Sequence, residues 1–296
     1  MKNTVFTGAG VAIVTPMHPD GRVNYDKLHE LIDWHIAEGT DAIVICGTTG
    51  ESSTLTDEEH VECIRHAIEW TAGRIPVIAG TGSNDTSYAI KLSKEAEALG
   101  ADALLLVTPY YNKTSQRGLI AHFTAIADSV HIPTILYNVP SRTGVTIAPA
   151  TYKVLSAHPN IVATKEASGN IAAIAQTKAL CGDALDIYSG NDNEIVPILA
   201  LGAKGVISVM SNCLPKETHD ICALWLQGKT GESLALQLKL LDFALALFSD
   251  VNPIPVKAAM NLLGKEVGEC RLPLVPMSEA GLNELKASMA RLGLVE

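Results

Sequence analysis

Short runs of apolar, often β-branched residues alternate along the chain with longer amphipathic stretches. Eight of these runs end in Gly, Thr, Ser, Pro or Asn, and their starts are about 20 to 35 residues apart. This spacing is typical of units that contain a strand, a loop, a helix and a return loop. The runs occupy residues 10–16, 41–50, 76–82, 103–112, 133–142, 161–169, 186–192 and 205–212.

Within each run the apolar residues are consecutive, which is typical of parallel strands covered on both faces. The amphipathic stretches 25–38, 57–72, 86–99 and 116–129 lie between runs, and several begin near an Asp, Thr or Ser suited to capping a helix. Eight such units predict an α/β protein with a (β/α)8 TIM barrel. An open doubly wound sheet is the structural alternative, because six or seven strands would also fit the alternation.

After the eighth run the pattern is helical only, with segments 224–227, 231–248, 256–263 and 278–292 separated by Gly and Pro. We therefore expect a barrel catalytic domain over residues 1–228 and a C-terminal helical extension over residues 229–296. The stretch from Leu234 to Phe248 is too apolar to stand alone, so the extension should pack on the barrel or on another subunit. The expected state is an oligomer.

Composition narrows the class of protein. Of the 296 residues 47% are hydrophobic and 18% charged, and the net charge is −10, which predicts a folded chain and argues against nucleic acid or an anionic membrane as partner. The apolar segment 5–15 is better explained as a strand than as a signal peptide, and no run approaches the roughly 20 residues of a membrane helix. Six scattered cysteines without a C-x-x-C pair indicate free thiols in a reducing compartment. We expect a soluble, cytoplasmic protein.

Catalytic groups of a TIM barrel project from the C-terminal ends of its strands. Lys165 is the most informative residue there, because it follows the buried run 161–164. Desolvation lowers the pKa of a lysine, and the neutral amine attacks carbonyls to form a Schiff base. Lys165 could instead extend from the strand end to solvent. The other polar residues at such positions are Thr48, Thr49, Glu51, Tyr110, Tyr111, Tyr137, Asn138, Arg142, Glu166 and Ser168.

Three neighbouring features favour the nucleophile. Tyr137 is expected at the matching depth on the adjacent strand, where its phenol could move protons, although a buried tyrosine is commonly a core residue. The turn from Gly47 to Glu51 has backbone N–H groups and two hydroxyls, from Thr48 and Thr49, that could hold a carboxylate. Arg142 could bind a second carboxylate through two of its guanidinium nitrogens, or could be a surface charge.

These residues resemble the dihydrodipicolinate synthase family, which belongs to a superfamily with N-acetylneuraminate lyase and other 2-keto acid aldolases. The resemblance spans nearly the whole chain. Its motifs are Gly47–Ser52, Pro76–Gly82, Val107–Tyr111, Tyr137–Gly144, Lys165–Gly169 and Asn252–Lys257. The segment Ser141–Thr143 favours the synthase, since the sialic acid lyases lack this arginine.

The resemblance implies a carbon–oxygen lyase of the class I aldolase type, acting in diaminopimelate and lysine biosynthesis. Lys165 would condense with pyruvate, and the enamine would add to L-aspartate 4-semialdehyde to give 4-hydroxy-tetrahydrodipicolinate without metal or organic cofactor. Tyr137, Thr48 and Tyr111 would form a proton relay, with Tyr111 reaching a neighbouring subunit of a homotetramer built as a dimer of dimers. Thr49 and the backbone of Ile207 would hold pyruvate, and Arg142 would bind the semialdehyde carboxylate.

Some family members bind lysine as an inhibitor at a subunit interface. The matching positions in this chain are Ser52, Ser53, Asp57, His60, Asn84, Tyr88 and Tyr110. Lysine-sensitive relatives often have His at the position of Asp57 and Glu at that of Tyr88, so a carboxylate for the ligand's ammonium group is missing here. We therefore expect weak or absent inhibition by lysine.

Three other functions fit less well. A metal-dependent aldolase would need histidine ligands, but His29, His35, His60, His66 and His122 fall in helical patterns rather than at strand ends. The segment 80–85 weakly resembles a dinucleotide loop, but Asp85 replaces the third glycine. A non-enzymatic binding barrel would need no neutral lysine amine.

Overall fold

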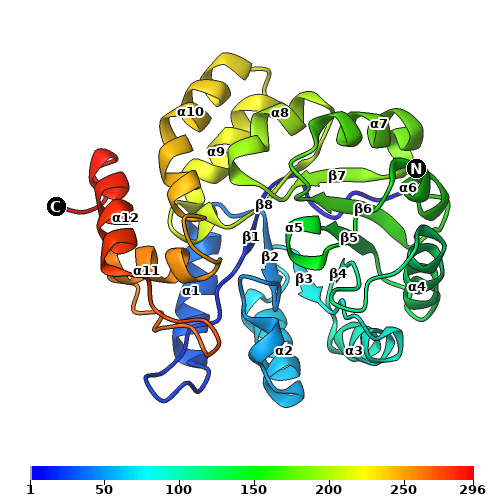
Figure 1. Ribbon diagram of the computed structural model, residues 1–296, viewed down its shortest axis with the longest axis horizontal. Coiled ribbons are helices and arrows are strands. Elements are labelled where there is room, and N and C mark those ends of the chain that lie inside the picture. The colour runs from blue at the N-terminus through cyan, green and yellow to red at the C-terminus, as the bar shows by residue number, and fades with distance from the viewer. Residues whose placement is uncertain (1) are drawn as a thin grey trace.

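The computed structural model describes residues 2–296 and shows eight parallel strands closed into a barrel in chain order, β1 to β8 (Figure 1). The strands are β1 (Gly8–Ala12), β2 (Ala42–Ile45), β3 (Val77–Gly80), β4 (Ala103–Val107), β5 (Thr134–Asn138), β6 (Ile161–Glu166), β7 (Asp186–Ser189) and β8 (Gly205–Ser208). Because β1 pairs in parallel with both β2 and β8, the sheet has no free edge. The predicted TIM barrel is confirmed, and the open doubly wound sheet is excluded.

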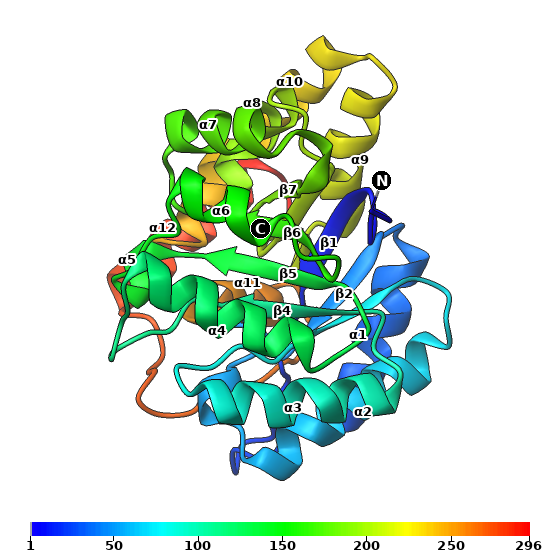
Figure 2. The same ribbon diagram turned by 90° about the vertical axis from the view of Figure 1, so that its right-hand side faces the viewer.

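Helices surround the barrel, as the side view in Figure 2 shows for α2, α3 and α4. The helices up to the last strand are α1 (Tyr25–Ala37), α2 (Asp57–Thr71), α3 (Thr86–Leu99), α4 (Gln116–Asp128), α5 (Pro140–Thr143), α6 (Pro149–Leu155), α7 (Ile171–Cys181) and α8 (Ile195–Ala200). The helices after it are α9 (Pro215–Leu226), α10 (Thr230–Ala246), α11 (Ile254–Leu262) and α12 (Glu279–Arg291).

Capping side chains explain why α1 to α4 begin where the sequence predicts. Thr56 and Glu59 form a capping box at the start of α2, so each satisfies a backbone N–H of the other. Asp85 and Ser115 accept backbone N–H groups at the starts of α3 and α4. Each of these helices therefore begins at the predicted residue, and each ends within one residue of its predicted end.

The eight predicted runs correspond to the eight strands, but most extend too far at the C-terminal end because they include polar loop residues. The prediction for α9 was too short, since only residues 224–227 were recognised and the helix begins at Pro215. Proline suits the first helical turn because its missing N–H would have no partner there. The mixed, partly polar residues that follow Pro215 concealed the helix.

The C-terminal helices pack on the barrel (Figure 1). Helix α10 contacts α8 and α9. The Gln237 side chain of α10 accepts the Val196 backbone N–H at 2.6 Å, and the Ser233 hydroxyl donates to the Ile221 carbonyl at 2.7 Å. Helix α11 returns toward the mouth of the barrel, where its buried residues meet the turn after β2. No helix within residues 2–296 combines the length and apolar character needed to cross a membrane.

Candidate active site

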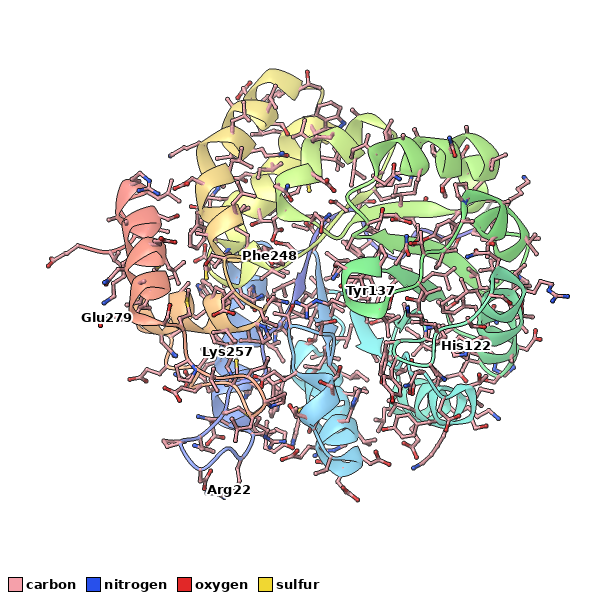
Figure 3. The ribbon with its side chains drawn as sticks, in the orientation of Figure 1. Arg22, His122, Tyr137, Phe248, Lys257 and Glu279 are labelled. Atoms are coloured by element: carbon pink, nitrogen blue, oxygen red, sulfur yellow. The ribbon has the colours of Figure 1, made fainter. Side chains whose placement is uncertain are left out.

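Lys165 and Tyr137 occupy facing positions on neighbouring strands. Lys165 is paired in register with Tyr137 across β5 and β6, and the Lys165 Nζ lies 4.5 Å from the centroid of the Tyr137 ring. Both side chains are buried, with 5% of Lys165 and 6% of Tyr137 exposed. The alternative in which Lys165 extends into solvent is therefore excluded, and its amine lies against the tyrosine at the barrel mouth, where Tyr137 is labelled in Figure 3.

Burial lowers the pKa of Lys165 to about 8. The carboxylate of Asp192 opposes this shift, and the guanidinium of Arg142 adds to it. At pH 7 roughly a tenth of such lysines are neutral, against less than ~0.1% for a solvated lysine with its pKa near 10.4. The barrel therefore supplies a far larger fraction of nucleophilic amine than an exposed lysine would.

Asp192 was not among the candidate residues, although it ends the seventh predicted strand run. It is 2% exposed, and its Oδ2 accepts the backbone N–H groups of Val209 and Met210 at 3.1 and 2.8 Å. Its Oδ1 is buried and has no hydrogen-bond partner within residues 2–296. Burial raises the pKa of Asp192, while the Ser208 hydroxyl, the two backbone N–H groups and, least of all, the charge of Lys165 oppose that rise. One oxygen of the Asp192 carboxylate is thus fixed by two backbone N–H groups, and the charge of the carboxylate interacts with that of Lys165.

Tyr137 and Thr48 line the same small cavity, where β5 and the turn after β2 converge. Burial raises the pKa of Tyr137, while the charge of Arg142 and the Thr48 hydroxyl act in the opposite direction. Two members of the expected relay are therefore neighbours within one chain.

The turn from Gly47 to Glu51 is anchored from the C-terminal segment. Thr49 is 2% exposed, and its Oγ1 accepts a hydrogen bond from the Asn252 side chain at 3.1 Å. Because Asn252 occupies an acceptor site of this oxygen, the Thr49 hydroxyl keeps its hydrogen for another partner. Glu51 is 3% exposed and pairs with Lys257 of α11.

Arg142 and Ile207 complete the expected substrate contacts. Arg142 lies on α5, and its Nη2 donates to the Asn252 carbonyl at 3.1 Å. Ile207 is fully buried in β8, directly across from Gly10 of β1. Arg142 is exposed, so its other guanidinium nitrogens are available to an incoming carboxylate.

A hollow of about 270 Å³ opens beside these residues, and Thr48 and Arg142 both line it. Its wall also contains five of the seven positions expected for a regulatory ligand, Ser52, Ser53, His60, Tyr88 and Tyr110. The other two, Asp57 and Asn84, do not line it, and the Asn84 side chain donates to the Tyr110 carbonyl at 3.1 Å. The structure thus joins most of the regulatory candidates to the mouth of the candidate active site.

Tyr111 stands apart from the rest of the expected relay. It has a positive φ of 69° and is 92% exposed, the largest exposure among the large hydrophobic side chains of residues 2–296. Within one chain it therefore does not approach Tyr137 or Thr48 closely enough to be buried with them.

Residues 2–296 also contain no group of three or more His, Cys, Asp or Glu side chains arranged to hold a metal ion.

A family model described as the dihydrodipicolinate synthetase family matches residues 5–292. The chain belongs to this family. The family assignment agrees with the resemblance carried by the motifs around Thr48, Tyr137 and Lys165. The matched region includes both the barrel and the helices that follow it.

Relatives of the dihydrodipicolinate synthetase family resemble the chain over nearly its full length. The 4-hydroxy-tetrahydrodipicolinate synthase of Lachnoclostridium phytofermentans is 61% identical, over 98% of this chain and 99% of its own. That of Acetivibrio thermocellus is 56% identical over 100% of both chains. Among solved structures, the dihydrodipicolinate synthase of Aquifex aeolicus superposes with a TM-score of 0.95 at 45% identity, covering 98% of this chain and 99% of its own.

Proposed function

We propose that this chain is a 4-hydroxy-tetrahydrodipicolinate synthase of diaminopimelate and lysine biosynthesis, and that Lys165 is the nucleophile that condenses pyruvate with L-aspartate 4-semialdehyde. The observation that carries the residue assignment is a buried lysine at the barrel mouth whose pKa is lowered to about 8 and whose Nζ lies 4.5 Å from the Tyr137 ring centroid. A neutral amine in this position is the reactive form for Schiff-base chemistry.

In the first step the neutral Lys165 amine adds to the C2 carbonyl of pyruvate. Tyr137 donates a proton to the carbinolamine oxygen, which leaves as water and produces the protonated imine. The Tyr137 phenolate then takes a proton from the pyruvate methyl group, which gives the enamine and restores the phenol. Thr48 supports this step because its hydroxyl lies beside Tyr137 and favours the phenolate.

In the second step the enamine carbon attacks the aldehyde carbon of the semialdehyde, and the aldehyde oxygen takes a proton to become a hydroxyl. The amino group of the condensed product then attacks the imine carbon and displaces Lys165. This transimination closes the six-membered ring and restores the free amine. No oxidant, reductant or organic cofactor enters the balance.

Different groups are proposed to bind the carboxylates of the two substrates. The Thr49 hydroxyl, the backbone at Ile207 and the N–H groups of Thr48 and Thr49 are proposed to hold the pyruvate carboxylate, because the Thr49 hydroxyl keeps a free hydrogen beside Asn252. Arg142 is proposed to bind the semialdehyde carboxylate, since it lines the hollow. A local cation is needed for an anionic substrate in a chain whose net charge is −10.

We also propose a cytoplasmic homotetramer, arranged as a dimer of dimers, in which Tyr111 completes the relay of a neighbouring subunit. Its 92% exposure supports this role, because a tyrosine held outward on a loop can be covered only by another molecule. The chain would comprise a catalytic barrel, residues 1–228, and a helical extension, residues 229–296, packed against it.

Borohydride trapping tests the nucleophile. The protein is incubated with pyruvate, reduced, digested and analysed by mass spectrometry for a peptide that contains Lys165. The expected result is one reduced pyruvate adduct at Lys165, with no adduct in Lys165→Met. The absence of an adduct in the native protein would rule out the Schiff-base mechanism. Adding aspartate semialdehyde or N-acetylmannosamine as second substrate then separates the synthase from the sialic acid lyase.

Lysine inhibition is proposed to be weak or absent. The Tyr88 hydroxyl donates to Asp57 at 2.7 Å, and Lys91 lies 3.4 Å from the same carboxylate. Asp57 is therefore already neutralised and does not offer a free charge to the ammonium group of lysine. Titrating lysine into the steady-state assay tests this, and strong inhibition below millimolar concentration would contradict it.

A further inference from the structure

The turn that carries Thr48 and Thr49 ends in a strained residue. Glu51 has a φ of 55° and is not a glycine, so its left-handed backbone costs free energy that surrounding contacts must offset. Its side chain turns away from solvent, with 1% of it exposed. Whatever holds this carboxylate also holds the end of the turn.

Both carboxylate oxygens of Glu51 are held by residues more than 200 positions away in the chain. Oε1 accepts from the Lys257 Nζ at 2.8 Å, across a separation of 206 residues. Oε2 accepts the backbone N–H of Arg271 at 2.9 Å. The two partners lie on α11 and in the segment that follows it, so the C-terminal part of the chain fixes this residue.

Lys257 is a fully satisfied buried cation. Its side chain is 2% exposed, and its other two donor bonds reach the Thr15 carbonyl at 3.1 Å and the Glu269 carbonyl at 2.7 Å. An ammonium has three donors, and all three are used. Lys257 thus ties together the loop after β1, the turn after β2 and the segment before Arg271, and Figure 3 labels it on α11.

We propose that Glu51 and Lys257 form a positioning pair for the keto acid site. The buried ion pair fixes the turn from Gly47 so that the hydroxyls and backbone N–H groups of Thr48 and Thr49 face the pyruvate carboxylate. The C-terminal helices are then part of the binding apparatus, although none of their ion-pair atoms touches substrate. This inference rests on the proposed function, because it assumes that pyruvate occupies the turn.

The decisive variants are Lys257→Met and Glu51→Gln. Lys257→Met removes the cation and leaves Glu51 unpaired, which releases the turn. Glu51→Gln keeps the side-chain length and an acceptor for the Arg271 N–H but removes the charge, so it should perturb the turn less. It tests the same pair if Lys257→Met does not fold. The measurements are the pyruvate concentration that half-saturates borohydride trapping, the KM values for both substrates, and the melting temperature.

Displacing a binding turn by about 1 Å can cost about 100-fold in efficiency. For Lys257→Met we therefore expect the half-saturating pyruvate concentration to rise about 10- to 100-fold, with trapping still complete at saturation. Glu51→Gln should raise it by a smaller factor. The KM for the semialdehyde should change much less in both variants, because Arg142 is outside the turn.

The matched control is Asp41→Asn, which breaks a partly buried ion pair at the other end of the barrel. Asp41 accepts from His219 at 2.8 Å and from the Ala9 backbone at 2.7 Å, and it lies just before β2. This variant should lower the melting temperature without changing the half-saturating pyruvate concentration. A general loss of stability is thereby separated from an effect on the turn.

Unchanged half-saturation in both Lys257→Met and Glu51→Gln, with only the melting temperature lowered, would overturn the positioning role and leave the proposed function intact. No pyruvate adduct in the native protein would instead defeat the proposed function itself. The two failures are therefore distinguishable in one set of trapping experiments.

Discussion

Two buried lysines, one in the barrel and one in the C-terminal helices, should change stability in opposite directions when they are removed. Lys165 is 5% exposed and contacts the Tyr137 ring, whereas Lys257 is 1% exposed and is bound by Glu51 and two carbonyls. Replacing each with methionine keeps an unbranched side chain of similar length. The variants therefore compare a buried cation without an ion-pair partner in residues 2–296 with one that is fully paired.

The magnitude for Lys165 follows from its pKa. Folding lowers this pKa from 10.5 to about 8, and a shift of that size is worth about 3 kcal/mol. The lowered pKa means that the folded state disfavours the ammonium, so folding is penalised in full below pH 8 and the penalty disappears above pH 10.5. This net shift already includes the attraction between Asp192 and the cation. Lys165→Met should therefore stabilise the fold at pH 7 by about 1 to 3 kcal/mol.

Thermal unfolding followed by circular dichroism at pH 7 and pH 10 tests both signs. For Lys165→Met we expect the melting temperature to rise by roughly 5 °C at pH 7, and the gain to be mostly lost at pH 10. Lys257→Met should instead destabilise the protein by about 3 to 5 kcal/mol, since it leaves an uncompensated buried carboxylate. A lower melting temperature for Lys165→Met at pH 7, or a gain independent of pH, would refute the reasoning.

Three further variants test the site and the barrel. Tyr137→Phe removes the proton donor and should lower kcat about 100-fold or more with little change in the KM for pyruvate, and a steady-state loss under threefold would contradict this. Asp192→Asn removes the charge that raises the pKa of Lys165, so the pH profile of borohydride trapping should shift to lower pH. An unchanged profile would exclude the electrostatic coupling between Asp192 and Lys165. Gly80→Ala places a Cβ 2.2 Å from the Cys46 carbonyl oxygen, so it should destabilise the barrel by about 1 to 3 kcal/mol in thermal melts. Gly231→Ala is the control, because the space around Gly231 is open and this change should not destabilise the barrel.

The strands were predictable because a parallel barrel buries both faces of each strand, which leaves consecutive apolar residues in the sequence. Their ends were less predictable because the residues after each strand are loop residues at the barrel mouth, where polar groups follow the apolar run without a break. Helix α9 was partly missed for a related reason, since its first turns contain Lys216 and Glu217 and its periodicity is weak near Pro215.

The residues of the site also differ in whether the sequence alone could identify them. Lys165 could be recognised as a candidate from local sequence, because a cation at the end of a buried strand is costly and therefore informative. Asp192 gave no comparable signal, since an acidic residue after a strand is common in loops. Its importance arises from an unpartnered buried oxygen and from its electrostatic coupling to Lys165, and both depend on the neighbouring strands.

The sequence by itself determined the order of strands and helices, the caps of the early helices and the residue types at the strand ends, because these depend on periodicity and on hydrogen bonds between near neighbours. Only the tertiary structure decided that Lys165 is buried against Tyr137 and that Glu51 meets Lys257 across 206 residues. Burial and long-range pairing set the pKa of the lysine and the shape of the turn, and neither can be read from residues that are adjacent in the chain.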